Sequence, residues 1–186
     1  MSDMPISLLG YKAVSAVHGN ELLKSGVFHV TVSDEIKEHY HWLGNGIYFY
    51  PVKADAESWA NNMKGSEAFV VSAETIKLLS YEIYDFGDCM DNWWELKREE
   101  SRKAIESLRL DIGGIEKIPP LFEYRHKYAE NIWNNNPAVK VCMAKFPSKP
   151  LSECPKVNGL DIRYRRKEFC VRKNKYIIAA SIKRCG

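Results

Sequence analysis

The sequence predicts an α+β fold rather than a regular alternation of strands and helices. Strand patterns dominate the C-terminal part of the chain, whereas helical patterns are concentrated in its middle. No internal repeat or low-complexity tract is present. The length of 186 residues suits one domain. We therefore expect a single domain over residues 1–186, with a helical insertion at about 88–136 between strands.

The N-terminal third predicts two strands and one clear helix. A short buried strand is expected at 11–17, followed by one helical turn at 21–25 that Gly26 stops. The β-branched and aromatic run at 46–50 predicts a second strand, which Pro51 ends. Small and aromatic residues then recur at helical spacing, so a helix is expected from residue 54 to about residue 64.

The remaining elements alternate less regularly, and the longest helical pattern lies in the middle of the chain. Strands are expected where apolar residues alternate or run together, and helices where they recur every three or four residues. The expected strands are 68–71, 81–84, 139–143, 168–172 and 176–182, and the expected helices are 74–79, 91–110 and 121–133.

Composition excludes several classes of protein. Hydrophobic residues make up 45% and charged residues 27%, which are ordinary globular values. No apolar run reaches the length of a membrane span, and the N-terminus lacks the pattern of a signal peptide. We therefore expect a cytoplasmic protein with no membrane contact.

Cysteine and histidine spacing gives no support for a metal site. The five cysteines include no C-x-x-C pair, which favours reduced thiols. His39 and His41 would share one face of a strand, but no carboxylate or cysteine pattern completes a site. We expect no metal cofactor.

Three segments contain the candidate functional residues. They are V-H-G-N at 17–20, W-L-G-N-G-I-Y-F-Y at 42–50 with A-x-A-x-S-W-A at 54–60, and R-K-E-F-C-V-R-K at 166–173. Taken singly, each has a plain structural explanation. A histidine at a strand end is usually a surface or core residue, G-x-G before a strand is usually a turn, and I-Y-F-Y is usually core.

Taken together and in this order, the three segments resemble the ADP-ribosyltransferase superfamily. The match is closest to its diphtheria-toxin and poly(ADP-ribose) polymerase branch, which carries a His-Tyr-Glu set. His18-Gly19, the G-N-G-I-Y-F run at 44–49 and the E-F-C-V run at 168–171 match that branch in order. The resemblance covers three short blocks and leaves out the helical middle. It implies split mixed and antiparallel sheets around a site for NAD⁺ as co-substrate.

The resemblance also implies which residues bind NAD⁺. Nicotinamide is a flat cationic ring that suits aromatic faces. Tyr48 would stack on the ring, with Trp59, eleven residues later, as a second aromatic. Gly19 would offer backbone groups to the carboxamide, because glycine permits close approach. His18 would bond a ribose hydroxyl. Asn20 follows where many relatives carry Ser or Thr.

Glu168 is the expected catalytic carboxylate, with His18 and Tyr48 completing the catalytic set. Cleavage of the nicotinamide–ribose bond builds an oxocarbenium-like ribose, as in glycoside hydrolysis. The resemblance implies that Glu168 accepts a hydrogen bond from the ribose 2′-hydroxyl and stabilises the positive charge. Strand alternation puts Glu168 and Cys170 on one face, and Phe169 and Val171 on the other.

The acceptor is the least determined part of the prediction. In relatives that modify arginine an acidic residue stands two before the catalytic glutamate, but Arg166 occupies that position here. A basic run at 165–167 would suit an anionic acceptor such as a phosphate backbone, or would be a solvated turn. We expect a mono-ADP-ribosyltransferase acting on a macromolecule, with nucleic acid (RNA or DNA) slightly favoured over protein. By analogy it would be an intracellular toxin or anti-phage effector, with an antitoxin protein as a partner.

Three alternatives remain open at this point. An NAD⁺ glycohydrolase would use water as the acceptor. A non-catalytic module on the same scaffold would bind NAD⁺ or nucleic acid without turnover. An RNA 2′-phosphotransferase shares the scaffold, but it needs a more basic catalytic set than His18 and Glu168 provide.

Overall fold

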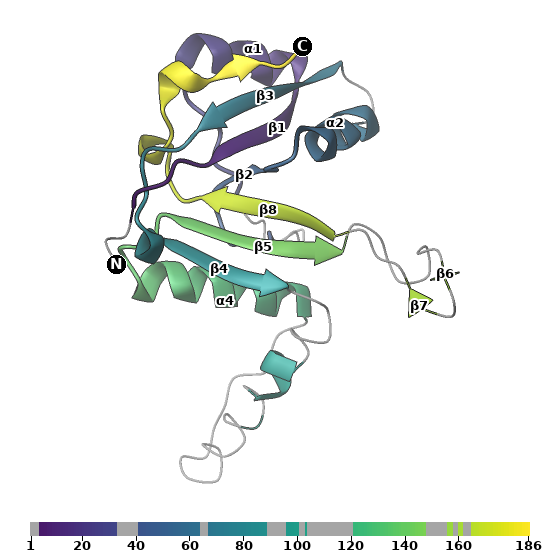
Figure 1. Cartoon of the computed structure of the whole chain (residues 1–186), viewed down its shortest axis with the longest axis vertical. Coiled ribbons are helices and arrows are strands. Elements are labelled where there is room, and N and C mark those ends of the chain that lie inside the picture. Colours follow the sequence, from purple (N-terminus) through teal and green to yellow (C-terminus); the bar gives the residue numbers. More distant parts are fainter. Residues whose placement is uncertain are drawn as a thin grey trace.

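The structure, a computed structural model, describes residues 4–32, 41–63, 67–88, 96–100, 103, 121–147, 156–157, 160–161 and 165–186. Over these residues the chain has an α+β fold, as the sequence predicts. It contains one antiparallel sheet, one mixed sheet and helices that pack beside them (Figure 1).

The smaller sheet is antiparallel and has the strand order β1-β3-β9. Strand β1 (Leu9–Ser15) pairs along its whole length with β3 (Ala68–Glu74), and β3 pairs with the short β9 (Lys183–Arg184). Helices α1 (Ala16–Ser25) and α2 (Lys53–Asn62) lie beside this sheet (Figure 1).

The larger sheet is mixed and has the strand order β2-β8-β5-β4. Its strands are β2 (Ile47–Phe49), β8 (Arg165–Val171), β5 (Val141–Pro147) and β4 (Ile83–Asp88). Only β4 and β5 run parallel. Helix α4 (Leu121–Asn135) lies along the sheet, and β6 (Lys156–Val157) and β7 (Leu160–Asp161) form a separate pair.

Two apolar clusters hold these layers together. The first joins the two sheets and includes Val71 from β3, Phe49 from β2 and Phe169 from β8. The second lies between the larger sheet and α4, and includes Trp133 and Cys170. The layers therefore run from the smaller sheet through the larger sheet to α4 (Figure 1).

In the described part of the chain, an isolated bridge joins the two sheets edge to edge. Tyr11 and Tyr50 exchange backbone hydrogen bonds of 2.7 and 2.8 Å, with each N–H donating to the other residue's carbonyl. Strand β1 therefore lies beside β2, and β2 lies beside β8. This order places three strands that are far apart in the sequence next to one another.

The first helix begins earlier than the sequence predicts. Strand β1 ends at Ser15, whose side chain caps α1 by accepting a 3.4 Å hydrogen bond from the backbone N–H of His18. The helix ends at Gly26, which has a φ of 67° and bonds back to Leu22. The prediction that His18 stands at a strand end is therefore wrong.

Two further segments differ from their predictions because long-range pairing overrides local preference. Residues 74–79 are not helical, since Thr75 pairs with Ile177 and Leu78 pairs with Ile6 in isolated bridges. Residues 176–182 form no continuous strand. They lie in and between the 3-10 turns η3 (Asn174–Tyr176) and η4 (Ala179–Ser181).

Two other predictions hold only in part. Of the predicted strand 81–84, the first part belongs to the 3-10 turn η1 (Ser80–Glu82), and β4 follows it. Residues 96–100 and 103 of the predicted helix 91–110 are helical, and the rest of that prediction lies outside the described residues. Within the described ranges, no helix is long and apolar enough to cross a membrane.

Candidate active site

Glu168 and Tyr48 lie on the same face of the larger sheet. Phe169 and Val171 of β8 point into the first apolar cluster, whereas Cys170 points into the second, so the predicted alternation is confirmed. Tyr48 is paired with Cys170 across β2 and β8. Tyr48 is therefore a diagonal cross-strand neighbour of Glu168, at about 7–8 Å between Cβ atoms.

The hydroxyl of Tyr50, the residue two after Tyr48, interacts with Glu168 and lowers the pKa of its carboxyl. Burial raises the pKa of Glu168 to about 7, although this interaction and the charges of Arg166 and Lys12 act in the opposite direction. Burial also raises the pKa of Tyr50, and the Glu168 charge raises it further. A carboxyl with such a pKa changes its charge near neutral pH, as catalytic carboxyls often do.

Lys12 of β1 lies close enough to this carboxyl for its charge to lower the carboxyl's pKa. Its Nζ donates a 3.3 Å hydrogen bond to the backbone carbonyl of Tyr48. Burial lowers the pKa of Lys12, while Cys170 and Glu168 raise it. Lys12 is not among the residues that the three motifs predict, although the sequence does mark it as unusual. A lysine inside an apolar strand is unusual, because lysine is rarely buried without a partner.

Arg166 ties β8 to α2 and is not an open basic residue. Its Nε lies 3.3 Å from Oδ1 of the buried Asp55, and its Nη2 donates a 3.0 Å hydrogen bond to Ser58 Oγ. Its side chain is only 22% exposed. The neighbouring Lys167 pairs with Asp85 at 3.3 Å. Arg166 therefore lies in an internal ion pair, and its role in acceptor binding stays a prediction.

Trp59 lies on α2, the helix that supplies Asp55 and Ser58, and it is 53% exposed. Trp59 is therefore not a core residue, and its indole is available to a ligand.

The structure does not bring His18 together with Glu168. His18 is exposed, its Nδ1 lies 3.1 Å from Ser15 Oγ, and its ring centroid lies 5.4 Å from that of His29. Strand β1 continues for three residues beyond Lys12 before α1 begins, which is about 10 Å of extended chain. Among the described contacts, none joins His18 to Tyr50 or Glu168.

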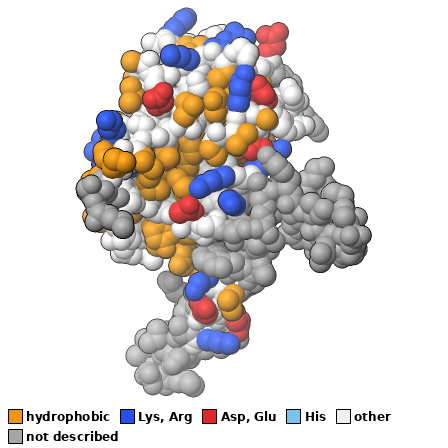
Figure 2. All heavy atoms as spheres, viewed as in Figure 1, with side chains coloured by type: hydrophobic (Ala, Val, Ile, Leu, Met, Phe, Trp, Pro, Cys, Tyr) orange, Lys and Arg blue, Asp and Glu red, His pale blue; other side chains and the backbone are white. Residues whose placement is uncertain are grey.

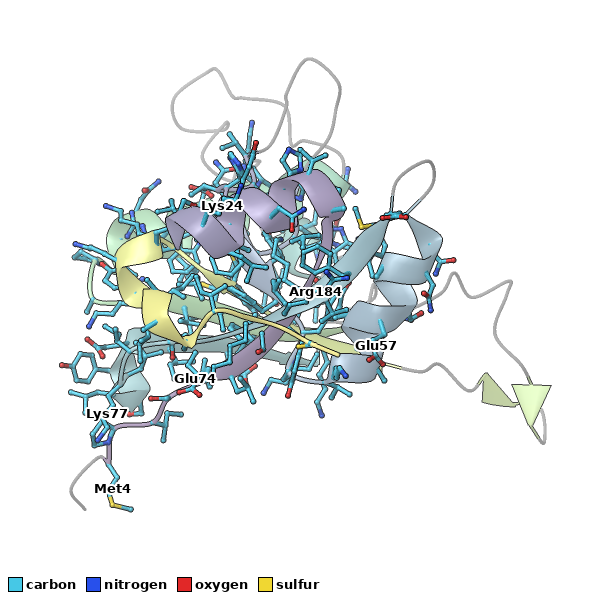
Figure 3. All side chains as sticks on the ribbon, turned by 90° about the horizontal axis from the view of Figure 1, so that it is seen from above. Met4, Lys24, Glu57, Glu74, Lys77 and Arg184 are labelled. Carbon is cyan, nitrogen blue, oxygen red and sulfur yellow. The ribbon has the colours of Figure 1, made fainter. Side chains whose placement is uncertain are left out.

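Gly19 and Asn20 also lie away from the carboxyl. Gly19 is buried, and a side chain there would collide with the ring of Phe69 and with Val14. Its small size is therefore required for packing α1 against the sheet. Asn20 lines a separate cavity of about 330 Å³ together with Ala16, Glu67, Ala68, Phe69 and Arg184. The guanidinium of Arg184, a residue labelled in Figure 3, lies 4.3 Å from the Phe69 ring centroid.

The G-N-G segment sets the position of Tyr48. The Tyr48 hydroxyl donates a 2.7 Å hydrogen bond to the Gly44 carbonyl and accepts one of 2.8 Å from the Leu43 N–H. Trp133 of α4 donates a 2.9 Å hydrogen bond to the Leu43 carbonyl. Gly44 has a φ of 79°, and a side chain there would meet Trp133 and Glu130. The turn and α4 together hold the phenol.

The site offers no group of three metal-binding side chains within the described part of the chain. Its chemistry is that of a half-buried carboxyl, a tyrosine hydroxyl, a buried ammonium and two aromatic rings. No family model, curated protein or solved structure matches the chain. The function is therefore argued from this geometry.

Proposed function

We propose that the chain is an NAD⁺-dependent mono-ADP-ribosyltransferase in which Glu168 promotes cleavage of the nicotinamide–ribose bond. The observation that carries the proposal is the placement of Glu168. It lies on the same sheet face as Tyr48, it is close enough to Tyr50 and Lys12 for both to lower the pKa of its carboxyl, and Lys12 itself is bonded to the Tyr48 carbonyl. The resemblance of the second and third sequence blocks, together with one antiparallel and one mixed sheet, supports the same reaction.

The carboxylate suits the charge that develops during the reaction. The C1′–N1 bond breaks, nicotinamide leaves with the electron pair, and positive charge grows on the ribose. An ionised Glu168 accepts a hydrogen bond from the 2′-hydroxyl and stabilises that charge. The acceptor nucleophile then forms a bond to C1′ and loses a proton. With a pKa of about 7, Glu168 is ionised in about half of the molecules at neutral pH.

The binding roles are revised from those that the sequence predicts. Tyr48 and Trp59 stay as the aromatic surfaces for nicotinamide, since Tyr48 is a diagonal neighbour of Glu168 and Trp59 is exposed on the helix that pairs with Arg166. Lys12 of β1 takes the place of His18 among the residues that bind NAD⁺. Its ammonium suits the diphosphate of NAD⁺. Gly19 and Asn20 are not part of the revised site.

The biological setting follows from the resemblance. We propose a macromolecular acceptor, with nucleic acid ahead of protein, and an intracellular toxin or anti-phage role in the cytoplasm with a restraining antitoxin. NAD⁺ is the co-substrate in this account, and no metal takes part.

The test is transfer of label from NAD⁺ that is labelled in its adenylate half. The chain is incubated with separate RNA, DNA and protein pools, and label in each pool is measured beside nicotinamide release. We expect nicotinamide release and labelling of a nucleic-acid pool. Nicotinamide release without label in any pool would instead identify a glycohydrolase, and no release at all would refute the proposal.

A matched substitution controls for loss of a negative charge. Glu168→Gln should abolish labelling, whereas Glu57→Gln removes an exposed carboxylate from α2 and should leave labelling unchanged (Figure 3). Equal labelling by both variants would show that Glu168 is not catalytic.

A further inference from the structure

Three segments that are distant in the sequence meet at one edge of the fold. They are residues 76–82, 139–141 and 172–178. Backbone hydrogen bonds interlock them: the Ile76 N–H donates to Tyr176, the Lys140 N–H to Glu82, and the Arg172 N–H to Lys140, at 2.8–3.0 Å. In Figure 1 this edge is on the left, where β5 begins and β8 ends.

The three segments concentrate positive charge. They contain one carboxylate, Glu82, and five cations, which are Lys77, Lys140, Arg172, Lys173 and Lys175. The whole chain has a net charge of only +3, so these segments account for more than its entire positive excess. Glu82 is 8% exposed and is paired with Lys140. We call this edge the basic surface.

Most of the cations on the basic surface face solvent. Lys77, Lys173 and Lys175 are exposed. In the space-filling view, basic side chains stand at the left margin of the face, beside hydrophobic ones (Figure 2). Exposed like charges repel one another, and a bound polyanion would relieve that repulsion.

Two tyrosines lie among these cations. The Nζ atoms of Lys140 and Lys175 lie 5.6 and 5.2 Å from the ring centroid of Tyr176. Tyr81, next to Glu82, is 62% exposed. Lysines that neutralise phosphates, interleaved with aromatic rings on which bases stack, are the combination that binds single-stranded nucleic acid.

We propose that the basic surface binds single-stranded nucleic acid. A folded duplex hides its bases from the tyrosines, so a single strand is the better match. Arg172 directly follows β8 and stands four residues after Glu168, which is about 13 Å of extended chain. The idea that the basic surface holds the acceptor during transfer rests on the proposed function. The binding of nucleic acid to this surface does not depend on that function.

The test measures binding without NAD⁺. The full chain is titrated against a fluorescein-labelled single-stranded RNA of about 20 nucleotides, and anisotropy is followed at several salt concentrations. We expect the logarithm of affinity to fall linearly with the logarithm of salt concentration. Lys173→Gln/Lys175→Gln should weaken binding and reduce the salt slope by about 1.4, or about 0.7 for each lost phosphate contact. Tyr81→Ala should weaken binding roughly five-fold or more, through lost stacking.

The control is Lys24→Gln/Lys183→Gln, which removes the same charge from α1 and β9. Lys24 lies well away from Lys77 (Figure 3). This variant should keep the wild-type salt slope. An equal loss in both variants would overturn the proposal, as would equal affinity for a duplex or for poly-glutamate. Nicotinamide release without acceptor, measured in parallel, reports on the active site alone and separates failure of that site from failure of the basic surface.

Discussion

Glu168→Gln should stabilise the protein at alkaline pH while removing its activity. The pKa of Glu168 is about 7 in the folded chain, against an ordinary value of 4.5. The folded state therefore binds this proton more tightly than the unfolded state. The stability that the protonated carboxyl supplies is fully present below about pH 4.5 and is lost as the pH rises through about 7.

The size of the effect follows from the shift. Each pKa unit corresponds to about 1.36 kcal/mol, so the ionised carboxylate lowers the free energy of unfolding by up to about 3 kcal/mol above pH 7. Glutamine cannot ionise and does not suffer this loss. For a chain of this size the difference corresponds to roughly 6–12 °C in Tm.

The assay is urea unfolding followed by tryptophan fluorescence at pH 5 and pH 8. The wild type and the Glu168→Gln variant should be nearly equal at pH 5, and the variant should be more stable at pH 8. Glu57→Gln, at an exposed position on α2, should show no such pH-dependent gain. A Glu168→Gln variant that is less stable than the wild type at pH 8 would show that the carboxylate is a structural ion-pair partner, and would refute the reasoning.

Three further predictions follow from contacts around the carboxyl. Tyr50→Phe removes a hydroxyl that lowers the pKa of Glu168, so the midpoint of the pH–rate profile for NAD⁺ cleavage should rise by about one unit; an unchanged midpoint would contradict the interaction. Lys12→Met removes the ammonium proposed to bind the diphosphate, so the KM for NAD⁺ should rise about tenfold or more; an unchanged KM would remove Lys12 from the NAD⁺ site. Asp55→Asn leaves Arg166 without its carboxylate and should lower the free energy of unfolding by about 1–3 kcal/mol, while the double variant with Arg166→Met should recover part of that loss in a thermodynamic cycle.

Local pattern was enough to predict the sheet face of the carboxyl. The alternation from Glu168 to Val171 obeys the two-residue period of a strand, and the core confirms it. The G-N-G turn before Tyr48 was also readable, since Gly44 has a positive φ that glycine tolerates. These features depend on neighbours in the sequence.

The position of His18 could not be predicted from apolar periodicity alone. The apolar residues between 13 and 17 continue the strand pattern across the point where Ser15 caps α1. A serine can serve as an N-cap, and this capping ends β1 three residues before His18. If Ser15 is taken as an N-cap, the sequence predicts His18 in a helix and leaves Lys12 within the strand.

The remaining differences arise from pairing between distant segments. Thr75 is drawn into a bridge with Ile177, which replaces the helix expected at 74–79. The basic surface likewise draws on three separate segments, and only one of them lies in the basic stretch near the C-terminus. The pattern within a single segment cannot predict that these segments meet in the folded chain.

Release of nicotinamide from NAD⁺ is the measurement closest to the central claim. The account predicts that the wild-type chain releases nicotinamide, that Glu168→Gln does so on the order of 10²–10³ times more slowly, and that Glu57→Gln matches the wild type. No release by the wild type, or undiminished release by Glu168→Gln, would contradict it.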